Sequence, residues 1–244
     1  MVVSICHIYG DVENLLPHYL KHYSNWKVDK IIFGVYRGPD NPSWSRIQSL
    51  GAKYPIELYS RGEDKLNVEL EGDFKNEIRK TLGPDDWYIP TDLDEFHRVP
   101  PYFKSVYDLI EAMKVEGADF VKSEFVDCIR EDGTIPMTID PDKPIWEQFP
   151  KRCHISYSIV NACCEKIVLA RSHVETFGGH HLPLKEELHK KFSKRGHTFH
   201  FKWFGPIYAK EKEKLETYTA QGRRWLNEQK NLLEWLDTHD GKLI

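Results

Sequence analysis

The sequence is poor in the features that mark secreted, membrane-spanning and repetitive proteins. Its 244 residues include five cysteines, an odd number with no C-x-x-C pair, so a disulfide framework is not expected and a reducing compartment is the simpler interpretation. No apolar run approaches the ~20 residues that a membrane helix requires. The start, MVVSICHIYG, lacks a basic n-region and is typical of a first strand, not of a signal peptide. These absences predict a soluble protein of the cytoplasm, or of a host cytoplasm if the source is viral, without a transmembrane segment.

Charge of either sign is not in marked excess. A net charge of -4 and a pI near 6.3 disfavour a nucleic-acid partner. With 40% hydrophobic and 30% charged residues, the composition is that of a globular protein, and the length suits one substantial α/β domain. The sequence has no internal repeat, low-complexity tract or heptad run.

The first hundred residues alternate strand-like apolar runs with helical patterns. Such alternation is typical of βαβ units around a largely parallel sheet. The expected strands cover residues 2–9, 30–36, 56–59 and 86–90, and the expected helices lie near 15–23, 43–53 and 70–82.

The second half departs from this alternation. A helix near 106–113 and a strand at 118–127 precede a stretch rich in Pro, Gly and Asp at 132–150, which suits a long functional loop. A strand at 166–170, a histidine-rich segment at 173–200 and one long C-terminal helix complete the chain. The predicted fold is therefore an α/β single domain with a mostly parallel central sheet flanked by helices.

The most informative stretch is WYIPTDLDEF, in which an apolar strand ends in three acidic residues. In an extended segment, Asp92 and Asp94 share one face, and two converging carboxylates require a positive charge between them. Hard oxygen ligands suit Mg²⁺ or Mn²⁺, and the carboxyl end of a strand is where open α/β sheets bind ligands. A cation there would neutralise a leaving pyrophosphate. The alternative is a solvated turn.

A resemblance extends over most of the chain. The resemblance lies in WYIPTDLDEF, in the opening HIYGDVENLLPHYLKHY and in the later segments CIREDG, WEQFP, KIVLAR and HFKW. In these segments the chain resembles the family-2-like glycosyltransferases with a GT-A fold, in particular the compact group with an Asp-x-Asp-Glu-Phe motif. This implies one Rossmann-like GT-A domain over 1–244, with a nucleotide-sugar-binding half (1–96), an acceptor and metal half (97–205) and a C-terminal helix (206–244). The Asn-Glu pair expected in the first loop is reversed here, as Glu13-Asn14.

The resemblance also implies an activity. It predicts a metal-dependent glycosyltransferase of hexosyltransferase type that moves a sugar from a nucleotide-sugar donor to a glycan or other hydroxyl acceptor, with Mn²⁺ or Mg²⁺ and with inversion. Two alternatives belong to other classes. Carboxylates with histidines also build the metal centres of phosphoesterases and pyrophosphatases, and the fold would equally serve a non-catalytic carbohydrate-binding domain.

The resemblance assigns the metal ligands. Asp94 is expected to bind the metal directly, and Asp92 to contact the ribose, the metal or its waters. A late histidine is expected to complete the shell, first His200 and then His180 or His181. For His200 the alternative is a partly buried histidine packed among aromatic residues.

Other roles are less defined. Inversion needs a carboxylate base within reach of the acceptor hydroxyl; Asp127 is the first candidate and Asp132 the second, although Asp132-Gly133 also fits a hairpin turn. Glu95 would orient the acceptor or pair with Arg98. By position, the residues expected to contact the nucleotide-sugar are Tyr9, Gly10, Glu13, Arg37, Asp40, Lys75, Asn76, Arg79 and Asp92. For Lys75 and Arg79 the alternative is a solvated helix face.

Two further groups of residues have more than one interpretation. Trp146, Phe149, Trp203 and Phe204 would stack on an acceptor sugar, with core packing expected for at least two of them. A zinc site built from the late histidines with Cys163 or Cys164 lacks any standard ligand spacing.

Overall fold

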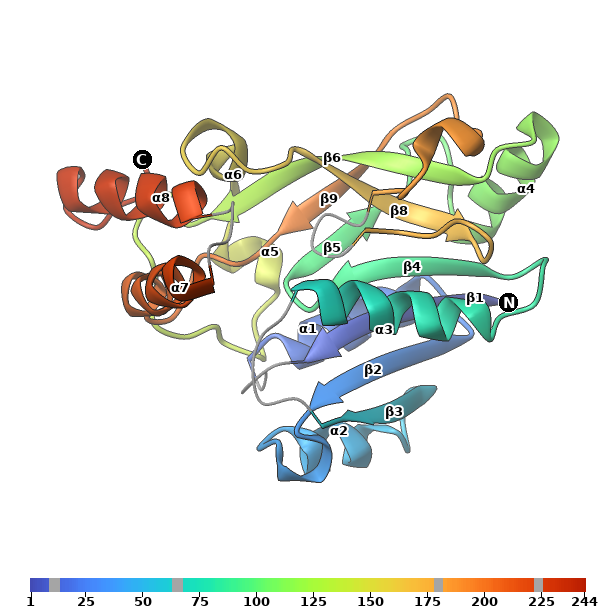
Figure 1. The fold of residues 1–244 in the computed structure, drawn as a ribbon, viewed down its shortest axis with the longest axis horizontal. Helices are drawn as coiled ribbons and strands as arrows, with labels where there is room; N and C mark the ends of the chain where they lie inside the picture. Colours follow the sequence, from blue (N-terminus) through green and yellow to red (C-terminus); the bar gives the residue numbers. More distant parts are fainter. Residues whose placement is uncertain (9–13, 63–67, 178–181, 222–225) are drawn as a thin grey trace. The chain divides into compact units, whose positions relative to one another are not determined.

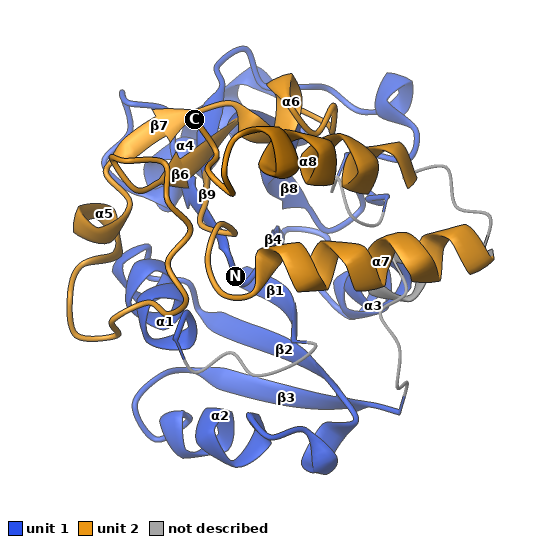
Figure 2. Ribbon diagram, turned by 90° about the vertical axis from the view of Figure 1, so that its left-hand side faces the viewer, with its two compact units in different colours: residues 1–124, 165–198 blue, residues 125–164, 199–244 orange. Residues whose placement is uncertain are grey.

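The computed structural model describes residues 1–8, 14–62, 68–177, 182–221 and 226–244. Its chain forms two compact units (Figure 2). Unit 1 contains residues Met1–Glu124 and Glu165–Thr198, and unit 2 contains Phe125–Cys164 and Phe199–Ile244. Two strands begin in the first unit and end in the second. These units do not follow the divisions after residues 96 and 205 that the resemblance implies.

Four parallel strands form one half of the sheet in unit 1 (Figure 1). They are β1 (Val2–Ile8), β2 (Lys30–Tyr36), β3 (Ile56–Arg61) and β4 (Trp87–Asp92), in the order β3-β2-β1-β4. All seven residues of β1 are buried, as expected for a parallel strand covered on both faces. The predicted α/β class is confirmed.

Helices α1 (Leu16–Asn25) and α3 (Val68–Lys80) pack on opposite faces of these strands. The hydroxyl of Ser4 lies 2.7 Å from that of Tyr19 on α1. His7, three residues further along β1, points the other way, and its ring stacks on Phe74 of α3 with centroids 4.5 Å apart. The remaining elements of this unit's helical layer are η1 (Gly38–Asp40), α2 (Trp44–Leu50), α4 (Val106–Glu116) and η2 (Glu186–Leu188).

Close contact between α3 and the sheet depends on a glycine. Gly34 of β2 lies opposite His7 in the ladder, and a Cβ at this position would come within 2.6 Å of both the His7 ring and the Phe74 ring. No side chain fits there without moving one of the two rings.

Beyond β4 the sheet becomes mixed. Strand β8 (Glu165–Arg171) pairs antiparallel with β4 and with β6 (Phe120–Ile129). The order continues β8-β6-β9-β5, with β9 at Gly196–His200 and β5 at Glu95–Arg98. The strands predicted at 118–127 and 166–170 are present, whereas β5 and β9 were not predicted.

Unit 2 contains the end of β6, the short strand β7 (Lys151–Cys153) and four helices. These are α5 (Ile145–Gln148), α6 (Ile155–Ser158), α7 (Ile207–Gln221) and α8 (Leu226–Thr238). The prediction of one long terminal helix is wrong. The Tyr208 hydroxyl donates to Asp237 Oδ1 at 2.7 Å, so the start of α7 lies beside the end of α8 and the two helices form a hairpin. Trp203, Leu232, Leu236 and Leu243 lie in the core of this unit.

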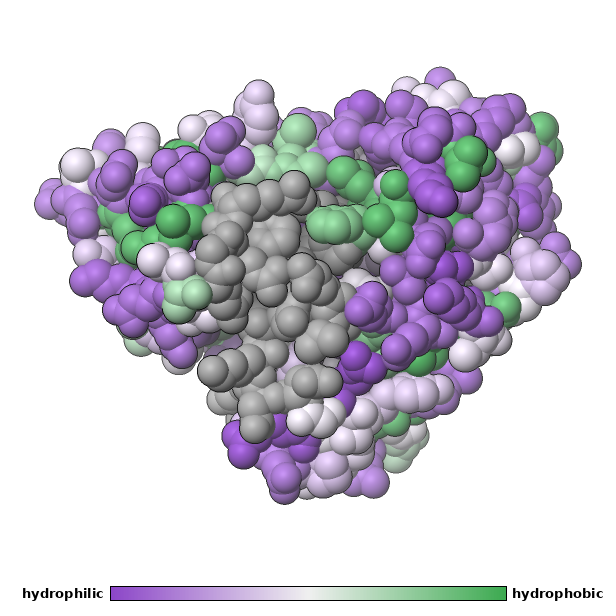
Figure 3. Space-filling model, viewed as in Figure 1, coloured by the Kyte–Doolittle hydropathy of each residue, from purple (hydrophilic) through white to green (hydrophobic). Residues whose placement is uncertain are grey.

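Hydrophilic residues dominate the described surface on the face drawn in Figure 3, and apolar residues lie there in small groups. Among the described residues, no helix combines the length and the apolar composition that crossing a bilayer requires.

Candidate functional site

Asp92 lies where the strand order reverses. It is the last residue of β4 and lies opposite His7 of β1. From β1 the chain proceeds to β2 and β3 on one side, and then returns to β4 on the other side. Ligands of open α/β sheets bind outside the carboxyl ends of the strands at such a switch point. The loop residues Tyr9, Gly10 and Glu13, predicted to contact the nucleotide, lie outside the described residues.

The acidic motif forms a tight turn. Strand β4 ends at Asp92, Leu93 and Asp94 form the turn, and β5 begins at Glu95. The expectation that Asp92 and Asp94 share one face of an extended strand is therefore wrong, because β4 ends at Asp92 and Asp94 lies in the turn that follows. The Tyr23 hydroxyl braces this turn by donating to the carbonyl of Glu95 at 3.1 Å. Asp94 lies in the turn itself, and its side chain is half-buried.

Two lysines supply the positive charge beside this turn. Lys75 of α3, which is fully buried, donates to Asp92 Oδ1 at 2.9 Å, while the Asp92 side chain remains 31% exposed. Lys166 of β8 lies 2.9 Å from Oε1 of the buried Glu95. Burial alone would lower the pKa of Lys166, but the charges of Glu95 and Asp92 outweigh burial and raise this pKa, so the ammonium stays charged.

These contacts correct two expectations. Lys75 is not on a solvated helix face, and Glu95, expected to orient an acceptor or to pair with Arg98, is buried and pairs with Lys166. The charge that offsets Asp92 is, in the first place, a lysine of the chain itself.

Two neighbours of Lys75 bind the chain after β8. Arg79 donates through Nη1 to the carbonyl of Ser172 at 3.0 Å, and Asn76 donates through Nδ2 to the carbonyl of Thr176 at 2.8 Å. Both side chains are buried, so the solvated-face alternative is wrong for Arg79 as well. A contact of either residue with a nucleotide remains a prediction.

Arg37 and Asp40 follow β2 and are exposed. Arg37 adopts a left-handed conformation with φ 62°, which turns the chain into η1. Both residues thus lie at the carboxyl end of a parallel strand, where the prediction places them.

In unit 2, Asp127 is fully buried and fully hydrogen-bonded. Its Oδ1 accepts from His200 Nδ1 at 2.9 Å, from Trp203 Nε1 at 2.8 Å and from the Ser156 hydroxyl at 2.8 Å. Its Oδ2 accepts from the Ser156 backbone N–H at 2.6 Å. Burial would raise the pKa of Asp127, but these donors, with His200 first, hold it below its ordinary value.

This environment bears on the role of Asp127. An ionised carboxylate only accepts hydrogen bonds, so Nδ1 of His200 is the donor in this contact. A buried acid with a lowered pKa and four donors is a poor proton acceptor, and the general-base role of Asp127 stays a prediction. The same contacts fix the ring of His200, as a carboxylate does behind a metal-binding histidine. The alternative for His200, a buried position among aromatic residues, also agrees with its ring contact to Phe125 at 4.6 Å.

Asp132 forms the turn that its sequence allows. Its Oδ1 accepts from the Thr134 backbone N–H at 3.0 Å and from the Thr134 hydroxyl at 2.7 Å, and these bonds lower its pKa. Gly133 has φ 72°. The turn is confirmed, and a catalytic role for Asp132 stays a prediction. His180 and His181 lie outside the described residues.

The aromatic residues near the predicted loops belong largely to the interior. Phe149 and Trp203 are each 1% exposed, which confirms core packing for two of the four. Trp146 meets the rings of Phe199 and Phe201 edge-on, at 5.2 and 5.0 Å. Trp146 and Phe204 are half-buried.

A buried acid of α7 binds two lysines. Glu211 is 1% exposed and lies 3.4 Å from Lys202 and 2.9 Å from Lys214. Burial opposes ionisation, but the two ammonium groups lower the pKa of Glu211 to about 2. Lys202 and Lys214 thus hold this carboxylate in its ionised form.

Comparison with known proteins gives distant structural similarities only. No protein-family model matches the chain, and no curated protein matches it. The structure is similar to that of HddC from Yersinia pseudotuberculosis, with a TM-score of 0.42 and 13% identity over 87% of this chain and 98% of HddC. The same protein complexed with GMP-PN gives a TM-score of 0.41 and 11% identity over 82% of this chain and 92% of HddC. A 4-diphosphocytidyl-2C-methyl-D-erythritol synthase gives a TM-score of 0.37 and 14% identity over 70% of this chain and 75% of the synthase. At this distance, nothing that these proteins bind or catalyse is transferred to this chain.

Proposed function

We propose that the chain is a metal-dependent, family-2-like glycosyltransferase with a GT-A fold, which transfers a sugar from a nucleotide-sugar to a hydroxyl acceptor with inversion. One observation carries the proposal. Asp92 ends β4 at the switch point of the parallel strands, and the turn that follows presents Asp94 beside it. A nucleotide site is expected at this end of such a sheet.

The residues present suit a hard divalent cation. Asp94 offers a carboxylate on a short turn, and Asp92 offers an oxygen whose charge Lys75 already offsets. We assign the metal contact to Asp94, and the ribose or a metal-bound water to Asp92. A bound Mn²⁺ or Mg²⁺ would act as a Lewis acid that stabilises the departing nucleotide diphosphate.

Lys75 and Lys166 have a supporting role in this proposal. Two carboxylates in one tight turn, with Glu95 directly after them, repel one another unless cations lie nearby. The buried pairs Lys75–Asp92 and Lys166–Glu95 offset this repulsion, so the turn is stable before any ligand arrives. Rigid support of this kind keeps Asp92 in place for the donor.

Within unit 2, His200 suits the role of a metal ligand. Asp127 holds the Nδ1 side of its ring, which orients the Nε2 lone pair. In this assignment Asp127 is a positioning residue, and the acceptor proton is taken by another carboxylate, for which Asp132 is the remaining candidate.

The proposal is tested with a panel of nucleotide-sugars, each with Mn²⁺, with Mg²⁺ and with chelator, while the released products are identified. Selection of one donor with metal-dependent release of a nucleoside diphosphate, faster when a sugar acceptor is added, is the expected result. Release of a nucleoside monophosphate with a sugar phosphate would instead identify a pyrophosphatase. Metal-independent sugar binding without any turnover would identify a binding domain.

A further inference from the structure

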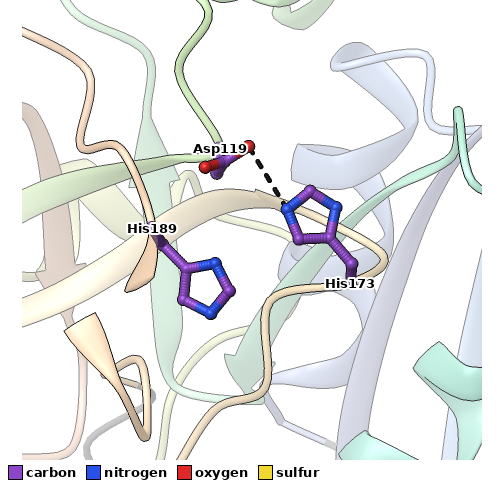
Figure 4. Close-up of side chains that lie close together, drawn as sticks. All are labelled: Asp119, His173 and His189. Atoms are coloured by element: carbon purple, nitrogen blue, oxygen red, sulfur yellow. Dashed lines mark ion pairs between the residues drawn. The ribbon is translucent and has the colours of Figure 1, made fainter. Parts of the chain in front are cut away.

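Three metal-ligating side chains gather at another place in unit 1. Asp119, His173 and His189 form the one group of three in the described part of the chain whose ligand atoms all lie within 4.8 Å of one another. His173 Nε2 is 3.2 Å from Asp119 Oδ1, and the two imidazole centroids are 5.6 Å apart. Figure 4 shows the two rings and the carboxylate around a common space.

Main-chain hydrogen bonds hold the carboxylate between the two histidines. The N–H of Asp119 donates to the carbonyl of Lys190 at 2.7 Å, and the N–H of Lys190 donates to Asp119 Oδ2 at 2.9 Å. The N–H of Arg171 donates to the carbonyl of Asp119 at 2.8 Å. Lys190 follows His189, and Arg171 lies two residues before His173. The segments that carry the three ligands are thus held together by these hydrogen bonds, independently of any ion.

The geometry and the donor atoms fit zinc. With metal–ligand bonds of about 2.0–2.2 Å, two ligand atoms of a tetrahedral zinc lie about 3.3 Å apart, close to the measured His173–Asp119 separation. His173 has a half-exposed side chain, and His189 is half-buried, so small rotations of the rings bring the third ligand to the same distance. Two imidazoles and one carboxylate favour Zn²⁺, whereas sites of carboxylates and water favour Mg²⁺ or Mn²⁺.

This group is separate from the acidic turn at Asp92. Arg171, whose N–H contacts Asp119, lies opposite Trp87 at the beginning of β4. Asp92 is at the other end of the same strand, which at about 3.3 Å per residue is roughly 16 Å away. The two positions therefore cannot share one ion.

We propose that Asp119, His173 and His189 bind Zn²⁺ as three protein ligands, with a fourth position open to water or to an external ligand. Zinc there would join the start of β6 to the chain after β8 and to the chain before β9. The ligands are far apart in the sequence, which is why no zinc-like spacing is visible, and the group contains neither Cys163 nor Cys164.

An ion pair between protonated His173 and Asp119 is the competing explanation. It needs no metal and gives His189 no part. The two explanations therefore differ in what removal of His189 does.

The test uses the full chain, stripped with chelator and titrated with ZnCl₂ in a calorimeter, with Co²⁺ absorption as a second signal from the same site. One equivalent of Zn²⁺ is expected to bind the wild type and the Asp94→Asn variant alike. His173→Ala and His189→Ala should each weaken binding by at least about tenfold and remove the absorption of a four-coordinate cobalt centre. His197→Ala is the matched control, because His197 lies 3.8 Å from Glu124 but belongs to no group of three ligand atoms among the described residues.

Three results would overturn the proposal. Zinc affinity unchanged in both histidine variants, or reduced only in His173→Ala, would leave the ion pair as the explanation. Loss of zinc in Asp94→Asn alone would place the ion at the other end of β4. Thermal unfolding of each variant without metal shows that the fold persists, which the exposure of His173 leads us to expect.

Discussion

Lys75 and Asp92 form an unequal pair, because the ammonium that donates over 2.9 Å is fully buried while the carboxylate that accepts is 31% exposed. A charge without access to water depends on its partner far more than a charge that water can reach. The acidic residue at the end of β4 is therefore part of the stability of α3 as well as of the candidate site.

The different exposure of the two side chains predicts that loss of Asp92 destabilises the fold more than loss of Lys75. Asp92→Ala leaves a buried ammonium without this carboxylate and should lower the free energy of unfolding by about 3 kcal/mol. Lys75→Met leaves a carboxylate that water can solvate and should cost roughly half as much. Urea unfolding followed by circular dichroism measures both, and a larger loss in Lys75→Met would contradict the assignment.

Asp94 offers the cleaner test of the proposed activity. Asp94→Asn keeps the size of the turn residue and should abolish metal-dependent transfer while the free energy of unfolding changes by less than about 1 kcal/mol. Asp85→Asn, which alters an exposed acid before the same strand, should leave transfer intact. Full transfer activity in Asp94→Asn would remove Asp94 from the metal site.

The Tyr23 hydroxyl should contribute more to the free energy of unfolding than an exposed tyrosine hydroxyl does. Tyr23→Phe leaves the buried carbonyl of Glu95 short of one donor and should cost about 1–3 kcal/mol. Tyr107→Phe is its control, because the Tyr107 hydroxyl bonds to the carbonyl of Lys27 at an exposed position. Equal losses in the two variants, measured by chemical denaturation, would show that the turn does not depend on Tyr23.

Glu211 should make unit 2 sensitive to acid. Its pKa is about 2 in the folded chain and near the ordinary value of 4.5 when unfolded, so its stabilising contribution is present above about pH 4.5 and is lost as the pH falls toward 2. Such a shift corresponds to about 3 kcal/mol.

Unfolding at a series of pH values checks this expectation. In Glu211→Gln the free energy of unfolding should fall less steeply between pH 5 and pH 2 than in the wild type. Glu213→Gln alters an exposed residue of the same helix and should retain the wild-type slope. If the free energy of unfolding of Glu211→Gln falls with pH as steeply as that of the wild type, Glu211 is not the source of the acid sensitivity.

The parallel half of the fold is predictable because each of its signals is local. Strand β2 coincides with the predicted range 30–36, and β1, β3 and β4 differ from prediction by a few residues at their ends. Buried strands are continuous apolar runs, and the helices between them repeat every three or four residues. Alternation of the two types then predicts the parallel order.

The missed elements lack such signals. The sequence of β5, EFHR, is short and polar, and it follows an acidic motif that is typical of a loop. The sequence of β9, GHTFH, is short and lies inside a histidine-rich segment, so it shows no clear strand periodicity. At the C-terminus, one apolar pattern runs through both α7 and α8, so the sequence pattern alone predicted a single helix.

The place of single residues on their strands was predictable, but their contacts were not. Asp92 was located from the end of its strand, but its contact with Lys75 depends on how α3 lies on the sheet. Lys166 had one recognisable signal, because it begins the apolar run KIVLA. A lysine in a buried strand needs an acidic partner. Asp119, His173 and His189 come from three segments, and no spacing in the sequence connects them.

Because Gly34 has no side chain, the rings of His7 and Phe74 can stack beside it, with their centroids 4.5 Å apart. Phe74 and Lys75 are neighbours on α3, so a side chain added at position 34 would displace Phe74 and, with it, the ammonium group of Lys75. A substitution in the middle of β2 would thus change the contact between Lys75 and Asp92.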